Sequence, residues 1–377
     1  MRIALLTQQL TETALAHGYA ALSKSLWDLG IKDQHILYIK NGYSRNIEFP
    51  PGVEIYKSTI SRILFSPIWI ARYLKQYKPD VIISMPVFVN IAAIMGKLLA
   101  RESQSKLIIS ERAILSYYVN SDQSFNIRYK ILPFVLKRLY PKADGLVVNN
   151  FSVLQDLERN FQIHIDGVPK KVIHPAIDIE TIKKLREVQP DKEINELFDK
   201  PVVMSVGRLA KEKNFPLLIN AFKIVRKTID ARLLIFGDGP ERENLEKLID
   251  QLRLDDAHLL GYVDNPWRIM KKSDLFVLPS QKEAFGRVLV EAMVCGLPIV
   301  ATDAIGGGPK VILKDGECGS LIENNNVKAL AEEITLVLND MKLREKYITC
   351  GKSRFEDFLP SSIAQDWLSL IKDINNN

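Results

Sequence analysis

Long apolar runs are missing from this 377-residue chain. The longest, residues 87–96, is interrupted by Asn90 and is about half as long as a transmembrane helix needs to be. The apolar stretch at residues 3–7 is too short for the core of a signal peptide, and we interpret it as a buried strand. We therefore expect a cytoplasmic protein without a membrane span.

Cysteine is scarce, and the motifs of metal and dinucleotide sites are missing. The three cysteines, Cys295, Cys318 and Cys350, lie far apart and form no C-x-x-C, so we expect buried free thiols in a reducing compartment. No D-x-D follows a predicted strand, and we expect neither a metal nor another cofactor. Gly18 stands alone where a G-x-G-x-x-G would open the first helix, which argues against an NAD dehydrogenase.

Acidic residues are outnumbered in one half of the chain only. Residues 1–170 hold 21 Lys and Arg against 13 Asp and Glu, whereas the remaining residues hold 30 against 32. The net charge of +6 is therefore a surplus of +8 in the first half and −2 in the second. Such a surplus attracts an anionic partner. Because no nucleic-acid-binding motif is present, we expect an anionic membrane surface or a phosphorylated acceptor, and no nucleic acid.

One segment of the basic half interleaves bases with aromatic residues. These residues are Arg128, Tyr129, Lys130, Phe134, Lys137, Arg138 and Tyr140. The pattern is typical of a helix that lies in a membrane interface, and it predicts reversible membrane association through this half. Two other interpretations stay open: Pro133 breaks the helix, or the bases form a plain solvated face.

Short β-rich runs alternate with helical patterns along the whole chain. In the first half these runs are residues 3–7, 35–39, 81–84, 106–110, 145–149 and 171–173. In the second half they are residues 202–206, 233–236, 258–260, 275–278 and 299–301. The alternation predicts an α/β fold with two parallel, doubly wound sheets.

Composition suggests where one domain ends and the next begins. Residues 176–200 are charged, lack a strong apolar face and contain Pro190, so we place a linker there. The N-terminal domain is then residues 1–175, and the C-terminal domain is residues 201–359. Residues 360–377 carry apolar side chains at helical spacing, and we expect a terminal helix that packs near the domain junction.

Ligands of doubly wound sheets bind at the carboxyl ends of the strands. Four loops that follow predicted strands of the second half carry suitable residues: Gly207, Arg208 and Lys213; Gly237, Asp238 and Gly239; Glu283 and Gly286; and Gly306, Gly307 and Gly308. Each loop alone could be an ordinary glycine turn. Together they offer two cations, a carboxylate and exposed amides, which suit a sugar linked to a diphosphate.

The most specific segment runs from Glu283 to Glu291, where Gly286 opens a helix. Unsatisfied amides and the helix dipole favour an anionic diphosphate at such a helix start. We expect Glu283 to accept hydrogen bonds from sugar hydroxyls and Glu291 to bind a ribose, the alternative for Glu291 being a solvated helix position. The donor-binding residues expected at the helix start are Phe285, Gly286, Arg287 and Val288.

These motifs resemble those of the retaining glycosyltransferases of family 4, which have the GT-B fold. The resemblance rests on Gly207-Arg208-Leu209 with Glu212-Lys213-Asn214, on Gly237-Asp238-Gly239-Pro240, on Glu283 to Glu291 followed by Ala292 and Met293, and on Gly296-Leu297-Pro298. It covers nearly all of the second half in order and spacing. It implies two Rossmann-like domains that face a central cleft, the N-terminal domain binding the acceptor and the C-terminal domain the nucleotide sugar.

The same resemblance implies roles in catalysis. Arg208 and Lys213 would hold the donor diphosphate, Glu283 would contact the donor sugar, and Glu291 would bind the ribose. Transfer would retain the anomeric configuration and would need neither a protein nucleophile nor a metal. The expected donor is a UDP-hexose or UDP-N-acetylhexosamine. The expected acceptor is a lipid-linked, lipopolysaccharide or capsule glycan at the cytoplasmic face of a bacterial inner membrane.

The first half departs from the family pattern near the acceptor. Of the glycine-rich turn that commonly follows the first strand, only Gly18 is kept. Ser110-Glu111-Arg112 stands where many relatives place a histidine near the transferring sugar. The acceptor-side candidates are therefore Gly18, Glu111 and Arg112, although Arg112 and Glu111 could also form a surface ion pair.

Two rival functions fit the same architecture. One is a nucleotide-sugar epimerase or phosphorylase, which would act without a glycan acceptor or would require pyridoxal phosphate. The other is a catalytically silent subunit that only binds. The presence of all four predicted donor-site side chains argues against a silent subunit.

Overall fold

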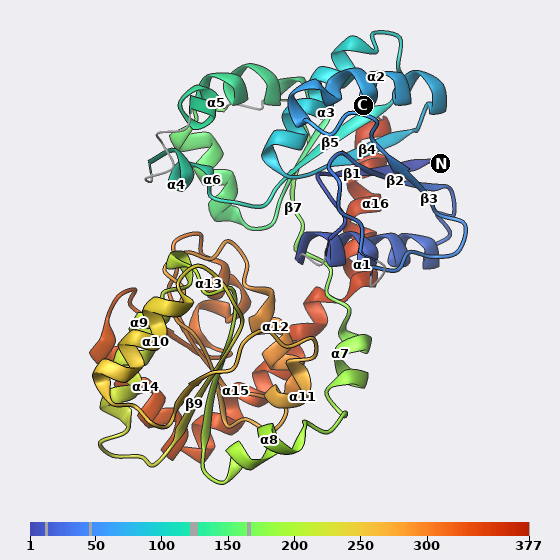
Figure 1. The fold of residues 1–377 in the computed structure, drawn as a ribbon. Coiled ribbons are helices and arrows are strands. Elements are labelled where there is room, and N and C mark those ends of the chain that lie inside the picture. The colour runs from blue at the N-terminus through green and yellow to red at the C-terminus, as the bar shows by residue number, and fades with distance from the viewer. Residues whose placement is uncertain (12–13, 45–46, 121–126, 164–166, 377) are drawn as a thin grey trace. The chain divides into compact units, whose positions relative to one another are not determined.

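The computed structural model describes residues 1–11, 14–44, 47–120, 127–163 and 167–376. They form two compact α/β units, each with its own parallel sheet and its own core (Figure 1). The first unit consists of Met1–Ile177 and Leu359–Asn377, and the second of Asp178–Phe358.

The sheet of the first unit has seven parallel strands in the order β3-β2-β1-β4-β5-β6-β7. Its central strands are buried on both faces, as parallel strands between two helical layers must be. The strands are β1 (Ile3–Thr7), β2 (Gln34–Tyr38), β3 (Glu54–Lys57), β4 (Val81–Ser84), β5 (Lys106–Glu111), β6 (Gly145–Val148) and β7 (Lys170–Val172).

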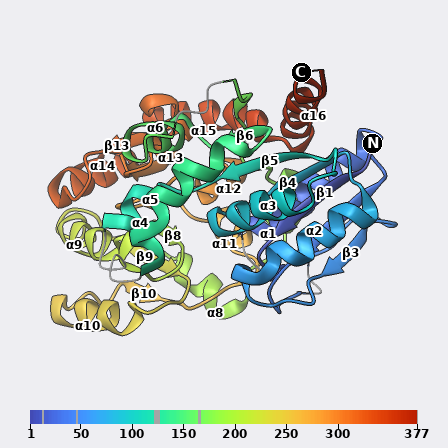
Figure 2. The same cartoon turned by 90° about the horizontal axis from the view of Figure 1, so that it is seen from above.

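Helices cover both faces of this sheet (Figures 1 and 2). They are α1 (Ala14–Asp28), α2 (Ser66–Tyr77), α3 (Val87–Leu99), α4 (Leu115–Asn120), α5 (Ile127–Leu139), α6 (Phe151–Asn160) and α16 (Pro360–Asn376), with short 3-10 helices η1 (Ile63–Phe65) and η3 (Tyr140–Lys142). Helices α2, α3 and α5 lie side by side on one face, where α3 contacts both of the others. Helices α1 and α16 pack together on the other face, and both contribute to the same core.

The second unit has a six-stranded parallel sheet in the order β10-β9-β8-β11-β12-β13. Its strands are β8 (Val202–Val206), β9 (Arg232–Phe236), β10 (Ala257–Leu259), β11 (Leu275–Leu278), β12 (Ile299–Thr302) and β13 (Ser320–Ile322). Its helices are α7 (Ile179–Leu185), α8 (Lys192–Asn195), α9 (Phe215–Val225), α10 (Arg242–Leu252), α11 (Trp267–Met270), α12 (Arg287–Cys295), α13 (Gly308–Ile312), α14 (Val327–Asn339) and α15 (Met341–Arg354). The 3-10 helices are η4 (Glu196–Phe198), η5 (Lys211–Lys213), η6 (Lys314–Gly316) and η7 (Phe355–Phe358).

The predicted α/β fold with two parallel sheets is confirmed. Sequence analysis missed two edge strands, β3 and β13. Strand β3 is mostly exposed, so it lacks the apolar run that marks a buried strand. Strand β13 has only three residues, which is too few for a periodicity to stand out.

The segment that we expected to be a linker, residues 176–200, is largely structured. Residues from Asp178 onward belong to the second unit, where α7 packs against α12. Asp178 caps α7, because its carboxylate accepts a hydrogen bond of 3.1 Å from the Thr181 amide. The boundary between the units therefore falls after Ile177, and the chain returns to the first unit at Leu359.

The expectation of three free thiols was wrong for two of them. Cys318 and Cys350 form a disulfide, with their Cα atoms 4.9 Å apart. Their separation of 32 positions concealed this proximity in the sequence, because the fold brings α15 back beside the turn before β13. Cys295 is a buried free thiol, and burial raises its pKa to about 12.

Trp367 on α16 provides a test of how the C-terminal segment stabilises the first unit. Its side chain is 1% exposed among residues of α1 and the central strands. We expect Trp367→Ala to lower the free energy of unfolding by about 3–5 kcal/mol, because the vacated volume cannot refill completely. Urea denaturation measures the loss. Leu336→Ala, at an exposed leucine of α14, is the control and should cost less than about 1 kcal/mol. Equal costs for the two changes would show that α16 is peripheral to the core.

Candidate functional site

Backbone hydrogen bonds join four loops at the carboxyl edge of the second sheet. The loops after β8 and β9 are joined where the Leu209 amide donates to the Asp238 carbonyl over 3.0 Å. The Gln281 amide donates to the Glu212 carbonyl over 2.9 Å, which joins the loop after β11 to η5. The Glu283 amide donates to Ile305 over 2.9 Å, which joins the β11 loop to the β12 loop. The loops that sequence analysis selected thus form one connected surface.

Two glycines allow these loops to approach one another closely. Gly237 has φ 136°, and a Cβ atom there would lie 1.9 Å from the Gly207 carbonyl oxygen. A Cβ atom at Gly308 would lie 2.4 Å from the Phe285 carbonyl oxygen. No larger residue fits at either position without moving the backbone. The glycines therefore have a packing role in the site, whether or not their amides also contact a ligand.

Lys213 and Glu283 meet on this surface. The Lys213 Nζ atom lies 2.5 Å from Glu283 Oε2, and the two side chains are 23% and 15% exposed. The aliphatic part of Lys213 also passes beside Gly207. A cation and a carboxylate predicted from loops 70 residues apart are therefore in direct contact.

Arg208 supplies a second cation next to Gly207. Its side chain is exposed, and within the described residues its guanidinium has no hydrogen bond or ion pair. Asp238 is also exposed, and its carboxylate accepts a hydrogen bond of 2.7 Å from the Gly239 amide. That bond shapes the loop after β9, so Asp238 has a structural role in the unliganded protein.

Helix α12 begins at this surface. Gly286 is its N-cap, with φ 92°, and the first bond of the helix runs from the Leu289 amide to the Gly286 carbonyl over 2.9 Å. The amides of Arg287 and Val288 precede that bond and, with the dipole, make the helix start favourable for an anion. Phe285 is buried and its ring packs edge-on against Phe358.

Glu291 is held by partners, so it is not the solvated helix position that sequence analysis left open. The Trp267 indole Nε1 donates to Glu291 Oε2 over 3.2 Å, and the Arg287 guanidinium lies 3.9 Å from Oε1. The Glu291 side chain is 14% exposed. Burial lowers the pKa of Arg287, while Glu291 and Asp178 oppose that change. The indole of Trp267 thus fixes Glu291 Oε2, whereas the Arg287 guanidinium is too far from Oε1 for a hydrogen bond.

Trp267 is the residue of this site that sequence analysis missed. It starts α11, a four-residue helix that follows β10 and contacts α12. A helix of four residues is too short to show a periodicity, and its single tryptophan belongs to none of the motifs of the second half. Its position after a strand of the same sheet was the one available signal.

The acceptor-side candidates lie at the carboxyl edge of the first sheet. Glu111 ends β5 and is fully buried, and it accepts hydrogen bonds from Tyr140 Oη over 2.9 Å and from the Arg112 amide over 3.0 Å. Burial raises the pKa of Glu111 to about 7, although these two bonds act to lower it. Glu111 is therefore not part of the surface ion pair that was the alternative interpretation.

Arg112 turns its guanidinium toward Ser110 and α1. Its Nε atom donates to Ser110 Oγ over 3.0 Å, and its charge acts on the phenol of Tyr19. Burial lowers the pKa of Arg112 to about 10, so the group stays charged at neutral pH. Gly18 precedes Tyr19 on α1, which places all three candidates in one region of the first unit.

Comparison with known proteins identifies the family. Residues 188–354 match the model of the glycosyl transferases group 1. The N-acetylgalactosamine-N,N'-diacetylbacillosaminyl-diphospho-undecaprenol 4-alpha-N-acetylgalactosaminyltransferase of Campylobacter jejuni is 33% identical, and the match covers 75% of this chain and 73% of that protein. The chain belongs to the group 1 glycosyltransferases. The matched segment contains every predicted donor-site residue of this glycosyltransferase.

Two further similarities concern a second relative and the fold. The GalNAc-alpha-(1->4)-GalNAc-alpha-(1->3)-diNAcBac-PP-undecaprenol alpha-1,4-N-acetyl-D-galactosaminyltransferase of Campylobacter jejuni is 28% identical over 81% of this chain and 78% of its own. The crystal structure of Anabaena HepE in complex with UDP and glucose matches with a TM-score of 0.77 and 20% identity over 99% of both chains. The GT-B fold of this glycosyltransferase is therefore established.

Neither a metal site nor a membrane span emerges from the part of the glycosyltransferase that the structure describes. There, no group of three or more His, Cys, Asp or Glu side chains could hold a metal ion. The described helices are all too short or too polar to cross a bilayer.

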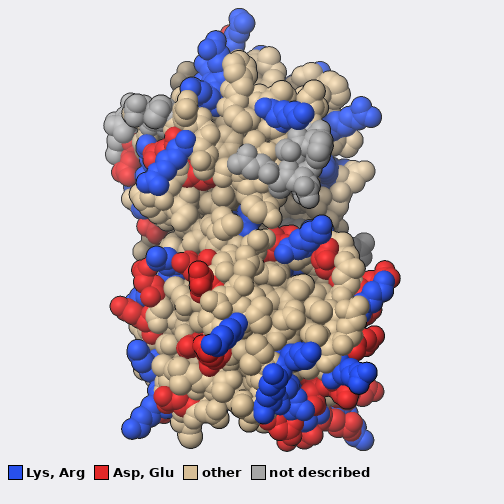
Figure 3. Space-filling view, turned by 90° about the vertical axis from the view of Figure 1, so that its left-hand side faces the viewer, with Lys and Arg blue, Asp and Glu red and all other residues tan. Residues whose placement is uncertain are grey.

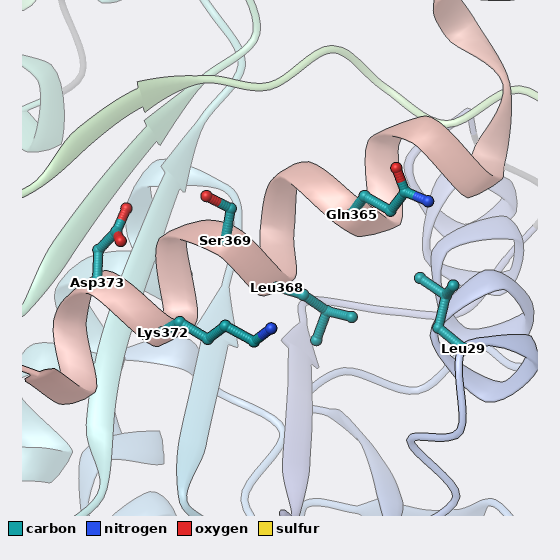
Figure 4. A pocket seen from close by; sticks show the side chains of 6 residues that line it. All are labelled: Leu29, Gln365, Leu368, Ser369, Lys372 and Asp373. Atoms are coloured by element: carbon teal, nitrogen blue, oxygen red, sulfur yellow. The ribbon is translucent and has the colours of Figure 1, made fainter.

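A shallow pocket of the first unit lies away from the candidate sites (Figure 4). It is lined by Leu29, Gln365, Leu368, Ser369, Lys372 and Asp373. Leu29 follows the C-terminal end of α1, whereas Gly18 lies near the N-terminal end of that helix. The pocket is thus at the opposite end of α1 from the acceptor-side candidates, and we assign it no role in the reaction.

The contact between Trp267 and Glu291 gives a prediction for UDP binding. We expect Glu291→Gln to lower the affinity for free UDP about tenfold to a hundredfold, because a hydrogen bond to a charged group contributes about 1.5–3 kcal/mol. Trp267→Phe keeps an aromatic ring but removes the indole N–H donor. It should therefore also lower the affinity for UDP, by a smaller factor. Calorimetric titration measures both affinities.

Glu283→Gln is the matched control, because Glu283 makes no contact with bound UDP in this assignment and its loss should not weaken the binding of UDP. If Glu283→Gln and Glu291→Gln weaken UDP equally, the assignment of one to the sugar and the other to the ribose is wrong. Unchanged affinity in Trp267→Phe would remove Trp267 from the positioning of Glu291.

Proposed function

We propose that this glycosyltransferase moves a hexose or N-acetylhexosamine from a UDP-sugar to a lipid-linked, lipopolysaccharide or capsule glycan, with retention of the anomeric configuration. The observation that carries the proposal is the contact of Lys213 with Glu283 beside the start of α12. One point of the surface thus offers a cation for a phosphate, a carboxylate for a sugar and a helix start for a second anionic oxygen.

Known proteins support the choice of donor and acceptor. The two Campylobacter jejuni relatives are named for N-acetylgalactosamine transfer to diphospho-undecaprenol-linked sugars. The Anabaena neighbour was crystallised with UDP and glucose. Residues on the described surface suit the same ligands, since Trp267 holds Glu291, the carboxylate expected to bind a ribose, and Arg208 is an unpaired cation within the described residues.

The proposed reaction assigns a task to each of these side chains. A donor diphosphate takes the place of Glu283 at Lys213, and Glu283 turns to a hydroxyl of the donor sugar. The bond between the anomeric carbon and the β-phosphate oxygen breaks, and its electron pair leaves with UDP. Arg208, Lys213 and the α12 amides stabilise that charge. The acceptor oxygen bonds to the same face of the sugar, and its proton passes to a phosphate oxygen.

The first unit is the proposed acceptor side. Two buried polar atoms at the carboxyl edge of its sheet, Thr7 Oγ1 and Asn149 Oδ1, have no hydrogen-bond partner among the described residues. Asn149 Oδ1 can accept from an acceptor hydroxyl, Thr7 Oγ1 can donate or accept, and the charged Arg112 suits a phosphate oxygen. A protein that elongates such glycans would work at the cytoplasmic face of the inner membrane.

A screen of nucleotide sugars tests the proposal directly. UDP-sugars at about a hundred times their Kd should add roughly 2.7 kcal/mol of stability and raise the Tm, whereas GDP-sugars and dTDP-sugars should not. The stabilising UDP-sugar is then incubated with an undecaprenyl diphosphate glycan, and NMR couplings report the anomeric configuration of the product. Epimerised donor without transfer, or a requirement for pyridoxal phosphate, would favour an epimerase or phosphorylase. Binding without turnover would favour a silent subunit.

Arg208 and Lys213 are predicted to act on one leaving group. Removing either should lower kcat roughly tenfold to several-hundredfold, since each contact contributes about 1.5–3 kcal/mol and about 1.4 kcal/mol is a decade in rate. The double change should lose less than the product of the single losses. Steady-state kinetics of Arg208→Ala, Lys213→Ala and the double variant provide the measurement.

Lys211 is the matched control for these variants, because it lies on the same short helix η5 and is exposed. Lys211→Ala should keep normal turnover and a normal Tm. Full activity in a folded Lys213→Ala protein would exclude Lys213 from the reaction. Full activity in both single variants would contradict the catalytic assignment as a whole.

Chelation gives an independent prediction. EDTA should leave the transfer rate nearly unchanged, because Arg208, Lys213 and the start of α12 would supply the charge that a divalent ion provides elsewhere. Rates are measured with and without EDTA and after addition of Mg²⁺ or Mn²⁺. Loss of most activity with EDTA, restored by either ion, would reveal a metal site and contradict the prediction.

A further inference from the structure

Exposed apolar side chains gather on the face of the first unit that α2, α3 and α5 form. Leu64 and Phe65 of η1, Leu99 of α3, and Ile127, Ile131 and Phe134 of α5 are each more than half exposed. We call these six residues the apolar face. Helix α3 contacts η1, α2 and α5, so the six residues lie on connected elements (Figure 2). Large apolar side chains exposed on neighbouring elements are a feature of contact surfaces.

Helix α5 has its apolar residues on both sides. Leu132 and Leu136 are buried, and α5 packs against α3. Ile127, Ile131 and Phe134 follow each other at helical spacing on the outward side, where Phe134 is 75% exposed. Core packing accounts for the inward side only. The outward side therefore has the pattern of a contact surface.

Basic residues border the apolar face without acidic neighbours in the sequence. Residues 127–142 contain five Lys and Arg and no Asp or Glu. Lys130, Lys137 and Arg138 are exposed beside the outward stripe of α5. Figure 3 shows Lys and Arg side chains at the upper end of this unit, where most of the surrounding surface belongs to residues other than Lys, Arg, Asp and Glu.

The structure also corrects the set of residues that the sequence suggested. Tyr140 is fully buried and donates to Glu111, so it cannot take part in a surface contact. Pro133 lies inside α5 and does not end it. The aromatic residue of α5 that remains fully outside is Phe134, and the neighbouring η1 adds Phe65.

We propose that the apolar face is a docking surface for an anionic lipid bilayer. Apolar side chains would enter the boundary between headgroups and acyl chains, and the flanking bases would contact anionic headgroups. A protein partner fits less well, since lysine is depleted in protein interfaces. A second copy of the chain would place five bases opposite five bases and repel itself. This proposal does not depend on the donor chemistry.

Sedimentation with vesicles tests the proposal with the full-length protein. It should bind phosphatidylcholine vesicles that contain phosphatidylglycerol, should bind pure phosphatidylcholine much more weakly, and should be released as NaCl rises. Ile131→Ser with Phe134→Ser should lower the partition coefficient at least tenfold. Lys130→Gln, Lys137→Gln and Arg138→Gln together should lower it by about a hundredfold.

Matched control variants lie on the second unit. Leu336→Ser with Met341→Ser removes exposed apolar side chains of α14 and α15, and Lys328→Gln, Lys342→Gln and Lys346→Gln remove three exposed bases. These controls should bind vesicles like the unchanged protein. All variants should keep their Tm and their affinity for UDP, which separates loss of docking from loss of the fold or of the donor site.

Three outcomes would overturn the proposal. The unchanged protein could fail to bind anionic vesicles at low salt. Binding could fall equally in the control variants, which would indicate general charge attraction. A dimer in gel filtration that Phe134→Ser dissociates would show that a second copy covers the apolar face.

Discussion

Hydrogen bonds between loop backbones hold the candidate donor site together, and the positions of all its side chains depend on them. Parallel strands end at one edge of a sheet, so loops from distant parts of the chain meet there. The bonds from Leu209 to Asp238 and from Glu283 to Ile305 then fix the loops to one another. Glycine at positions 237 and 308 makes this spacing possible, because any side chain there would collide with the neighbouring backbone.

The same constraint explains why much of the site could be predicted from the sequence. Lys213 and Glu283 each follow a recognisable buried strand. Because these parallel strands end at the same edge of the sheet, Lys213 Nζ and Glu283 Oε2 lie 2.5 Å apart. The contact of Trp267 with Glu291 could not be predicted in this way, because it depends on how α11 packs against α12. The disulfide of Cys318 with Cys350 depends on packing in the same manner.

The strands likewise differ in how well the sequence predicts them. Strands buried on both faces, such as β1 and β8, are apolar runs that the sequence makes obvious. Edge strands β3 and β13 are exposed or short, so their pairing with a neighbour defines them more than their own residues do. Charge asymmetry pointed to the first unit, but only the structure separates the outward Phe134 from the buried Tyr140.

Hydrogen exchange of the whole protein with and without UDP tests the location of the donor site most directly. The account predicts slower exchange in residues 207–214 and 283–291 when UDP is bound, with residues 106–112 of the first unit unchanged. Protection confined to the first unit would contradict it, as would protection of the second unit that leaves the start of α12 unaffected.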